Sequence, residues 1–342
     1  MREPVVSVIM SSYNHASVVA RTIESVLSQS FEDFEFLIED DGSTDGTAEV
    51  LKTFADKRIK LLLNEANRGA GVVTNRLISR TAGKYVALIN SDDVWVPEKL
   101  ARQVGWLDPN ADIAAVLSRA LFIDEHDRPL DPSKLPTGDV FKQENRSRGD
   151  WLRRFFYDGN CLCNPSMMIR RNALIRAGAF DNRLRQLPDL DMWVRVSKRE
   201  RFHVDAAPLV KFRIWKSGQN VSAGSAENSV RTHLEHMLIS ETFFDGVDDA
   251  LLREGFGSLL RRPDLPSRMH REIEECLLYF GDPNAGYVRT LRLIGYRKLY
   301  ALLGRPDVRT VLEQDYGIDD RFFQSTAAVG AVLFPAGQGG AP

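Results

Sequence analysis

Two pairs of adjacent carboxylates are the residues of this sequence that point most directly to chemistry. Asp40 and Asp41 follow an apolar segment at residues 34–38, and Asp92 and Asp93 follow another at residues 85–89. Adjacent carboxylates repel each other, and burial without a partner disfavours them strongly. A divalent cation relieves this repulsion, because Mg²⁺ and Mn²⁺ prefer oxygen ligands. The alternative is a solvated turn in which Asp93 caps a following helix.

Hydrophobic patterning places these carboxylates at the ends of strands. Short apolar runs predict buried strands, and apolar residues at helical spacing predict the helices between them. Strands are expected at residues 5–10, 34–38, 59–63, 85–89, 114–122, 166–170 and 204–214, and helices at about 18–27, 47–55, 70–81, 97–107, 151–156, 172–177 and 189–198. This alternation predicts an α/β fold whose mostly parallel sheet carries helices on both faces.

The carboxyl ends of parallel strands share one edge of a sheet, which is where ligands bind in open α/β folds. Ser11, Tyr13 and Asn14 end the first strand at this edge, together with the two carboxylate pairs. These residue types suit a nucleotide, because an aromatic ring such as Tyr13 can lie on a base. Arg68 precedes the helix expected at 70–81, whose N-terminus favours phosphate.

The carboxylates can divide the binding of such a ligand among them. Asp41 can accept a hydrogen bond from a base N–H group, Asp92 can reach a ribose hydroxyl, and Asp93 can bind a metal ion on the diphosphate. Asp40 lies close by. We therefore expect a nucleotide site with a divalent cation, Mn²⁺ or Mg²⁺, at this edge of the sheet.

Composition narrows the class of protein further. The chain has 342 residues, is 43% hydrophobic and carries a net charge of -2, so it has no basic field that would attract nucleic acid. Its three cysteines make no disulfide framework, and it lacks an apolar run of about 18 residues that would predict a transmembrane helix. The N-terminus enters a strand at once, so no signal peptide is expected. We expect a cytoplasmic protein, with peripheral contact at the inner membrane face as an alternative.

The pattern changes after residue 225. We expect an α/β domain at residues 1–225, a helical extension at 226–326, where apolar residues recur at helical spacing between prolines, and a disordered tail at 327–342 that is rich in glycine and small residues. The helical extension has three candidate binding partners: the acceptor, a partner protein or second copy of this chain, and the membrane surface.

Six ordered motifs within about residues 3–222 form a recognisable set: VSVIMSSYN at 6–14, SVLSQ at 25–29, DDGSTDG at 40–46, NRG at 67–69, AGKY at 82–85 and NSDD at 90–93. As a set they resemble the family 2 glycosyltransferases of GT-A fold, among them the bacterial spore-coat polysaccharide glycosyltransferase. The resemblance implies inverting transfer of a sugar from a nucleotide-diphosphate-sugar, expected to be a UDP-sugar, to an acceptor hydroxyl. It implies a divalent metal, a saccharide, lipid-linked or protein acceptor, and a place in cell-surface polysaccharide or glycoconjugate synthesis.

Carried over by position, the resemblance assigns Ser11, Tyr13 and Asp41 to the base, Asp92 to the ribose and Asp93 to the metal. The family's catalytic base lies in an acidic pair before an aromatic helix, and the matching stretch here is LPDLDMWVR at residues 187–195.

Within that stretch, Asp189 falls at the position of the base, and Asp191 and Trp193 are candidates for the acceptor side. For both aspartates, the alternative is to cap the helix that begins here. For Trp193, the alternative is a place in the core.

Two departures from the family pattern bear on the metal. Asn90 replaces the first acid of the common Asp-x-Asp-Asp motif, and FRIWK at residues 212–216 lacks the histidine of a Tyr-Arg-x-His pattern, so that Lys216 or Arg213 is a candidate to neutralise phosphate. These departures keep two other functions open. One is a metal-dependent sugar nucleotidyltransferase, and the other is a non-catalytic nucleotide-binding or scaffold protein.

Overall fold

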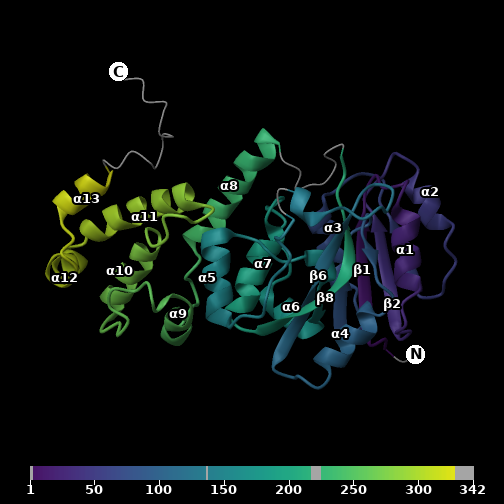
Figure 1. The fold of residues 1–342 in the computed structure, drawn as a ribbon, viewed down its shortest axis with the longest axis horizontal. Coiled ribbons are helices and arrows are strands. Elements are labelled where there is room, and N and C mark those ends of the chain that lie inside the picture. The colour runs from purple at the N-terminus through teal and green to yellow at the C-terminus, as the bar shows by residue number, and fades with distance from the viewer. Residues whose placement is uncertain (1–2, 136–137, 217–224, 328–342) are drawn as a thin grey trace. The chain divides into compact units, whose positions relative to one another are not determined.

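The computed structural model describes residues 3–135, 138–216 and 225–327. The chain forms two compact units: Met1–Asn145 with Asn160–Asn228, and Arg146–Gly159 with Ser229–Pro342. The chain therefore leaves the first unit, returns to it, and enters the second unit again (Figure 1). Each unit has its own hydrophobic core.

The first unit is built around one mixed sheet whose described strands lie in the order β3-β2-β1-β4-β7-β6-β8-β5. β1 pairs in parallel with β2 and β4, β2 pairs in parallel with β3, and β6 pairs in parallel with β8. β7 runs antiparallel to β4 and β6, and β5 runs antiparallel to β8. The predicted α/β fold with a mostly parallel sheet is confirmed, as is its helical C-terminal region.

The bounds of the elements follow the predicted segments closely. The first unit contains β1 (Val6–Ser12), α1 (Val19–Leu27), β2 (Phe34–Asp40), α2 (Thr47–Lys52), β3 (Ile59–Leu63), α3 (Ala70–Ser79), β4 (Tyr85–Leu88), β5 (Val94–Trp95), α4 (Lys99–Leu107), β6 (Ile113–Ile123), β7 (Met168–Arg170), α6 (Arg171–Ala177), α7 (Pro188–Ser197) and β8 (Arg201–Arg213). Two short 3-10 helices, Pro132–Lys134 and Asn164–Ser166, join them.

The central strands are buried on both faces because side chains alternate across a strand. In β1, Val6, Val8 and Met10 join a core that also contains buried residues of α1, α2 and α4. Ile9, of opposite parity, is also fully buried, as is Val73 of α3. Because both faces of β1 are buried, apolar residues are needed at odd and even positions of this strand.

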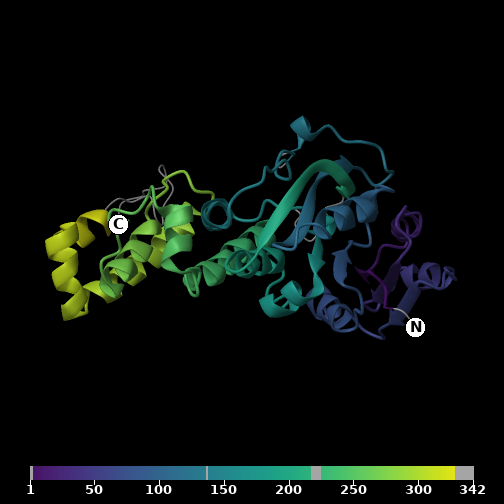
Figure 2. The ribbon, with the colours of Figure 1, turned by 90° about the horizontal axis from the view of Figure 1, so that it is seen from below.

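The second unit consists of α5 (Arg148–Asp158), most of α8 (Ala226–Glu241), α9 (Asp249–Phe256), α10 (Arg268–Leu278), α11 (Val288–Leu303), α12 (Pro306–Tyr316) and α13 (Asp320–Ala327). Figure 2 shows these helices, coloured from teal to yellow, from below. None of the described helices is long and apolar enough to cross a membrane. Residues 328–342 of the predicted tail lie outside the described residues.

Helix α5 packs on α9 through a pair of glycines. A Cβ atom on Gly149 would lie 2.4 Å from the backbone nitrogen of Gly255, and one on Gly255 would lie 2.3 Å from the carbonyl oxygen of Gly149. Two turns after Gly149, Phe156 packs against Phe243, Phe244 and other aromatic rings of this unit. Residues 146–159 therefore belong to the helical unit, although they lie inside the segment 1–225 that we expected to be one domain.

Candidate functional site

The structure brings the predicted residues of the first two strands to one edge of the sheet. Strands β1 and β2 run in parallel with Ser12 paired to Asp40, so the loops that follow them leave at the same edge. The backbone nitrogen of Asn14 donates to Ser43 Oγ over 2.9 Å, and Asn14 Oδ1 accepts from the backbone nitrogen of Thr44. These two loops therefore hold each other in place.

Asp40 and Asp41 are nearly fully buried, and their carboxylates are bound by the backbone. Asp40 accepts from the backbone nitrogen and hydroxyl of Ser43, over 2.9 and 2.6 Å. Asp41 accepts from the backbone nitrogens of Arg68 and Gly69, over 2.8 and 2.9 Å, at the N-terminus of α3. Both carboxylates thus order the loops, and a bond from Asp41 to a base would use the remaining lone pairs of its oxygens.

Other predicted nucleotide residues face solvent. The side chain of Tyr13 is 44% exposed, Arg68 is exposed, and Ser11 and Asn14 are half-buried. Asn14 has a φ of 52°, a left-handed conformation that asparagine tolerates better than most residues. An exposed tyrosine ring at a strand end is suited to stack on a planar ligand.

Asp93, the predicted metal ligand, is 1% exposed, and protein groups bind both of its oxygens. Oδ1 accepts from the backbone nitrogen of Arg213 over 2.9 Å, and Oδ2 accepts from Asn90 Nδ2 over 3.0 Å. Burial, and then the neighbouring charge of Asp92, raises the pKa of Asp93 well above its ordinary value. Asp93 therefore links the end of β8 to the loop after β4, and the hydrogen bond from Asn90 holds its carboxylate in place.

Asp92 lies next to this anchor but keeps contact with solvent, with 11% of its side chain exposed. Its Oδ2 accepts from the indole nitrogen of Trp215 over 2.9 Å and lies 4.0 Å from Nε2 of His15. The ring of His15 stacks on that of Trp215, with centroids 5.9 Å apart and planes 13° apart. Our sequence interpretation assigned no role to His15 or Trp215. The sequence indicated them only by position, because His15 follows the motif at residues 6–14 and Trp215 lies in the segment 212–216.

Arg213 cannot neutralise phosphate in this structure, contrary to one reading of the sequence. Its side chain is fully buried, and its guanidinium donates to the carbonyl oxygens of Asp92 and Asp124, each over 2.7 Å, and to the carboxylate of Asp127. The guanidinium thus holds the acidic loop against the turn after β6.

This edge of the sheet offers one carboxylate that could bind a divalent cation. Within residues 3–135, 138–216 and 225–327, no three His, Cys, Asp or Glu side chains converge in a way that could enclose a metal ion. A cation on a diphosphate needs only one or two protein carboxylates, because phosphate oxygens and water complete its coordination. Asp92 meets this requirement better than Asp93 does, since solvent reaches Asp92 and the oxygens of Asp93 are bound by Arg213 and Asn90.

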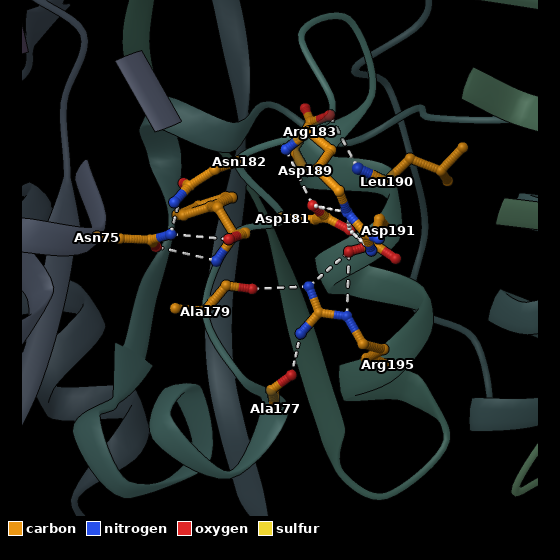
Figure 3. A network of polar contacts seen from close by, with 11 residues as sticks. Asn75, Ala177, Ala179, Asp181, Asn182, Arg183, Asp189, Leu190, Asp191 and Arg195 are labelled. Carbon is orange, nitrogen blue, oxygen red and sulfur yellow. Dashed lines mark hydrogen bonds and ion pairs between the residues drawn. The ribbon is translucent and has the colours of Figure 1, made fainter. Parts of the chain in front are cut away.

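Asp189, the predicted base, stands in the first turn of α7, where Pro188 begins the helix (Figure 3). Its Oδ2 accepts from Asn160 Nδ2 over 2.6 Å, and the orientation of that amide is fixed because Asn160 Oδ1 accepts from the backbone nitrogen of Leu162. No side-chain hydrogen bond caps α7 at Leu187. Asp189 is half-buried and thus reachable.

The loop that carries Asn160 also reaches the acidic loop. The indole nitrogen of Trp95 donates to the carbonyl oxygen of Pro165 over 3.0 Å. Burial, together with the charge of nearby Asp93, raises the pKa of the Cys163 thiol well above its ordinary value. Residues 160–165 therefore connect the predicted base with the loop that holds Asp92 and Asp93.

The two acceptor candidates have structural roles. Asp191 pairs with Arg195, one turn later on α7, over 2.6 Å, and Arg195 also donates to the carbonyl oxygens of Ala177 and Ala179 (Figure 3). Trp193 is fully buried and packs against Phe202 of β8. Asp191 thus anchors the helix, and Trp193 lies in the core, which was the alternative for it.

The loop before α7 is fixed to α3 by an asparagine. Asn75 Nδ2 donates to the carbonyl oxygen of Phe180 over 2.7 Å and to Asn182 Oδ1 over 2.8 Å, while Asn75 Oδ1 accepts from the backbone nitrogen of Phe180 (Figure 3). Both ends of the Asn75 amide are therefore used to hold the segment that leads to Asp189.

The family model for glycosyl transferase family 2 matches residues 7–182, which is more than half of the chain and includes nearly all of β1, the strands β2 to β7, the acidic loops and the start of the segment before α7. The chain belongs to this family. It is 31% identical over 219 residues to an uncharacterised glycosyltransferase of Methanocaldococcus jannaschii, covering 63% of this chain and 72% of that protein. These matches show the family and not the specificity of the spore-coat enzyme.

Another relative carries a more specific name. The chain is 38% identical over 110 residues to the UDP-Glc:alpha-D-GlcNAc-diphosphoundecaprenol beta-1,3-glucosyltransferase WfgD of Escherichia coli, over 32% of this chain and 44% of that protein. The shared part is thus less than half of that relative's length.

Solved structures of similar fold include Staphylococcus aureus TarS 1–349 in complex with UDP-GlcNAc, with a TM-score of 0.57, 18% identity and 91% of each chain covered. A mannosyltransferase of Pyrobaculum calidifontis in complex with GDP-Man and Mn²⁺ has a TM-score of 0.50, 17% identity, and 96% and 87% coverage. At these identities the likeness concerns the fold alone.

Proposed function

We propose that this protein transfers a sugar, with inversion at the anomeric carbon, from a nucleotide-diphosphate-sugar to an acceptor hydroxyl in the synthesis of a cell-surface polysaccharide or glycoconjugate. A UDP-sugar is the proposed donor and a lipid-linked saccharide the proposed acceptor, since WfgD is named for both. The observation that carries the proposal is the arrangement at one edge of the sheet. Exposed Tyr13 and Asp92, whose side chain is 11% exposed, lie at this edge, and the loop at residues 160–165 connects it by hydrogen bonds to Asp189.

In the proposed donor site, Tyr13 lies on the base, Ser11, Asn14 and Asp41 bind polar groups of the nucleoside, and Arg68 neighbours the phosphates. A divalent cation, when bound at Asp92, supplies positive charge that stabilises the diphosphate as it leaves. Asp92 also stays the predicted partner of the ribose. The sequence assigned the cation to Asp93, but Asp93 is 1% exposed and solvent reaches Asp92, which favours Asp92 instead.

In the proposed reaction, Asp189 accepts the proton of the acceptor hydroxyl. The acceptor oxygen forms a bond to the anomeric carbon from the face opposite the diphosphate, and the bond from that carbon to the phosphate oxygen breaks. Its electron pair leaves with the nucleoside diphosphate. Asn160 donates to Oδ2 of Asp189 and thereby orients the carboxylate. The configuration of the anomeric carbon is inverted because the new bond forms on the face opposite the bond that breaks, in a single step.

Replacement of the base tests the proposal. Asp189→Asn keeps the shape of the side chain and an oxygen that can accept from Asn160, but it removes the proton acceptor. Sugar transfer should fall by about 10²–10⁴-fold, while the Kd of UDP should change by no more than a few fold. Transfer is followed by UDP release in the presence of acceptor, and UDP binding by calorimetry. Asp181→Asn, which changes a surface pair with Arg183, is the control and should keep wild-type transfer.

The same assay separates the rival functions. A transferase releases UDP slowly from a UDP-sugar alone, whereas a sugar nucleotidyltransferase needs a nucleoside triphosphate and a sugar phosphate. A scaffold protein would bind UDP and release nothing. Wild-type transfer that is unchanged in Asp189→Asn, or binding and transfer that are lost together, would contradict the role of Asp189.

A further inference from the structure

His15 is a titratable side chain beside Asp92 that the proposed reaction does not use. It follows the β1 loop, and its backbone is fixed on both sides: its nitrogen donates to Thr47 Oγ1 over 2.9 Å, and its carbonyl oxygen accepts from the backbone nitrogens of Val18 and Val19. The imidazole is 20% exposed, so solvent reaches it. Its position is thus set by the backbone rather than by chance contact of a mobile side chain.

Both ring nitrogens of His15 have a defined environment. Nδ1 lies 2.7 Å from the hydroxyl of Ser91, which is buried. In the tautomer in which Nδ1 donates to Ser91, the lone pair of the neutral ring is on Nε2. A hydrogen bond at the distal nitrogen is the usual way in which a protein orients a histidine toward a metal ion.

Nε2 of His15 faces Asp92 across a gap that suits an ion. The distance from Nε2 to Asp92 Oδ2 is 4.0 Å, which is too long for a hydrogen bond. Two metal–ligand bonds of about 2.1 Å each can span such a distance. Trp215 fixes both partners, because its ring stacks on His15 and its indole nitrogen donates to Asp92.

We propose that His15 supplies a nitrogen ligand to the divalent cation that Asp92 holds, so that the cation site of this chain is a histidine–aspartate pair completed by phosphate oxygens of the donor. This inference rests on the proposed function, since the donor diphosphate supplies the other ligands. Mixed nitrogen and oxygen ligands favour Mn²⁺ over Mg²⁺, because imidazole suits transition metals and Mg²⁺ prefers oxygen.

The direct test uses the full chain with Mn²⁺ and UDP and observes the ligands of the metal. Electron spin echo envelope modulation of bound Mn²⁺ should show ³¹P modulation from UDP and ¹⁴N modulation from a coordinated imidazole. Protein labelled with [¹⁵N]histidine should lose the ¹⁴N modulation and keep the ³¹P modulation. This arm needs no substitution, so loss of folding in a variant cannot confuse it.

A variant then assigns the nitrogen to His15. His15→Gln should abolish the ¹⁴N modulation and weaken Mn²⁺ binding in the presence of UDP by about tenfold or more, with an unchanged melting temperature without ligands. His233→Gln, on α8 of the helical unit, is the matched control and should leave both unchanged.

The outcomes separate this inference from the proposed function. Wild-type protein that binds Mn²⁺ and UDP with ³¹P modulation but no ¹⁴N modulation, or ¹⁴N modulation that persists in His15→Gln, would overturn the role of His15 alone. Wild-type protein that binds no UDP, with or without Mn²⁺, would overturn the proposed function itself.

Discussion

At the scale of single residues, burial separates side chains that shape the site from those that meet a ligand. Asp40, Asp41 and Asp93 are nearly fully buried and bonded to the backbone or to neighbouring side chains, whereas Tyr13 and Asp92 retain contact with solvent. All five were candidates because of residue type and position. Sequence alone could not rank them, because a motif records which residues occur and not which of their atoms are already bonded.

Tyr13 offers a test of the nucleotide site that does not depend on catalysis. Stacking of a base on an aromatic ring contributes about 1–3 kcal/mol, so Tyr13→Ala should raise the Kd of UDP by about 5–150-fold. Tyr13→Phe keeps the ring and should stay within a few fold of wild type. Calorimetric titration with UDP provides both values. Equal affinity in Tyr13→Ala and wild type would remove Tyr13 from the site.

At the scale of elements, the sequence predicted most of the fold because the first unit has regular hydrophobic periods. Strands such as β2 and helices such as α3 were placed within a few residues of their observed bounds. The two-residue strand β5 was missed because so short a segment has no period, and the antiparallel direction of β7 was missed because direction depends on the connection and not on composition.

The strand β8 shows a second limit of sequence reasoning. It runs from Arg201 to Arg213 through Pro208, where its register with β6 shifts near Arg119. Proline removes a hydrogen-bond donor and thus favours an irregular point in a strand. The strand expected at residues 204–214 contains this proline, but only the structure shows that the strand delivers Arg213 to the acidic loop.

Glu35 connects four neighbouring segments of the sheet and makes stability depend on pH. Its carboxylate accepts from Ser7 of β1 over 2.5 Å, from the backbone nitrogen of Ala82 before β4 over 2.9 Å, and from Lys60 of β3 over 2.5 Å. Burial disfavours its charge, but the bonds from Lys60, Ser7 and Ala82 outweigh burial and hold the pKa of Glu35 below its ordinary value. The ionised form is therefore favoured in the folded protein.

Glu35→Gln should lower the free energy of unfolding at pH 7 by about 1–3 kcal/mol. The nitrogen head of Lys60 is exposed and screened, so the bonds from Ser7 and Ala82 should account for most of this loss. Because the pKa is lowered on folding, the difference from wild type is complete above the ordinary pKa of glutamate, about 4.3, and shrinks as the pH falls through the folded value. Urea unfolding between pH 7 and about pH 3 measures this, because the loss falls below the ordinary pKa of glutamate.

The control for Glu35→Gln is Glu49→Gln, which removes a surface carboxylate paired with Lys52 over 3.8 Å. Its free energy of unfolding should stay within about 0.5 kcal/mol of wild type. A difference between wild type and Glu35→Gln that is absent at pH 7, or that grows toward acid pH, would contradict the assigned role of Glu35.

At the scale of the whole molecule, the chain enters the helical unit twice. Helix α5 lies between strands in the sequence but packs with helices that follow residue 228, through the contact between Gly149 and Gly255. Hydrophobic period alone could predict the helix but not its partners, because a glycine pair carries no apolar signal. The domain boundary expected at residue 225 stays a prediction, although the compact units divide after Asn228 and around residues 146–159.

A chain cut after residue 225 should expose the side of α5 that packs against the later helices, which includes Phe156. We expect residues 1–225 alone to aggregate or bind the dye ANS strongly, because an exposed patch of large apolar side chains favours association. Coexpression with residues 226–342 should restore a soluble complex. Size-exclusion chromatography and ANS fluorescence measure both. A monomeric 1–225 fragment with full UDP affinity and no ANS signal would contradict this expectation.

The divided origin of the helical unit has a consequence for the timing of folding during synthesis. Helix α5 ends at Asp158 and its partner α9 begins at Asp249, so about 90 residues are made between them. At a synthesis rate of about 5–20 residues per second, the apolar face of α5 waits roughly 5–20 s for α9. During that interval the nascent chain presents the side of α5 that carries Phe156 to the cell. We expect this helix to be one of the segments that chaperones bind as the protein leaves the ribosome.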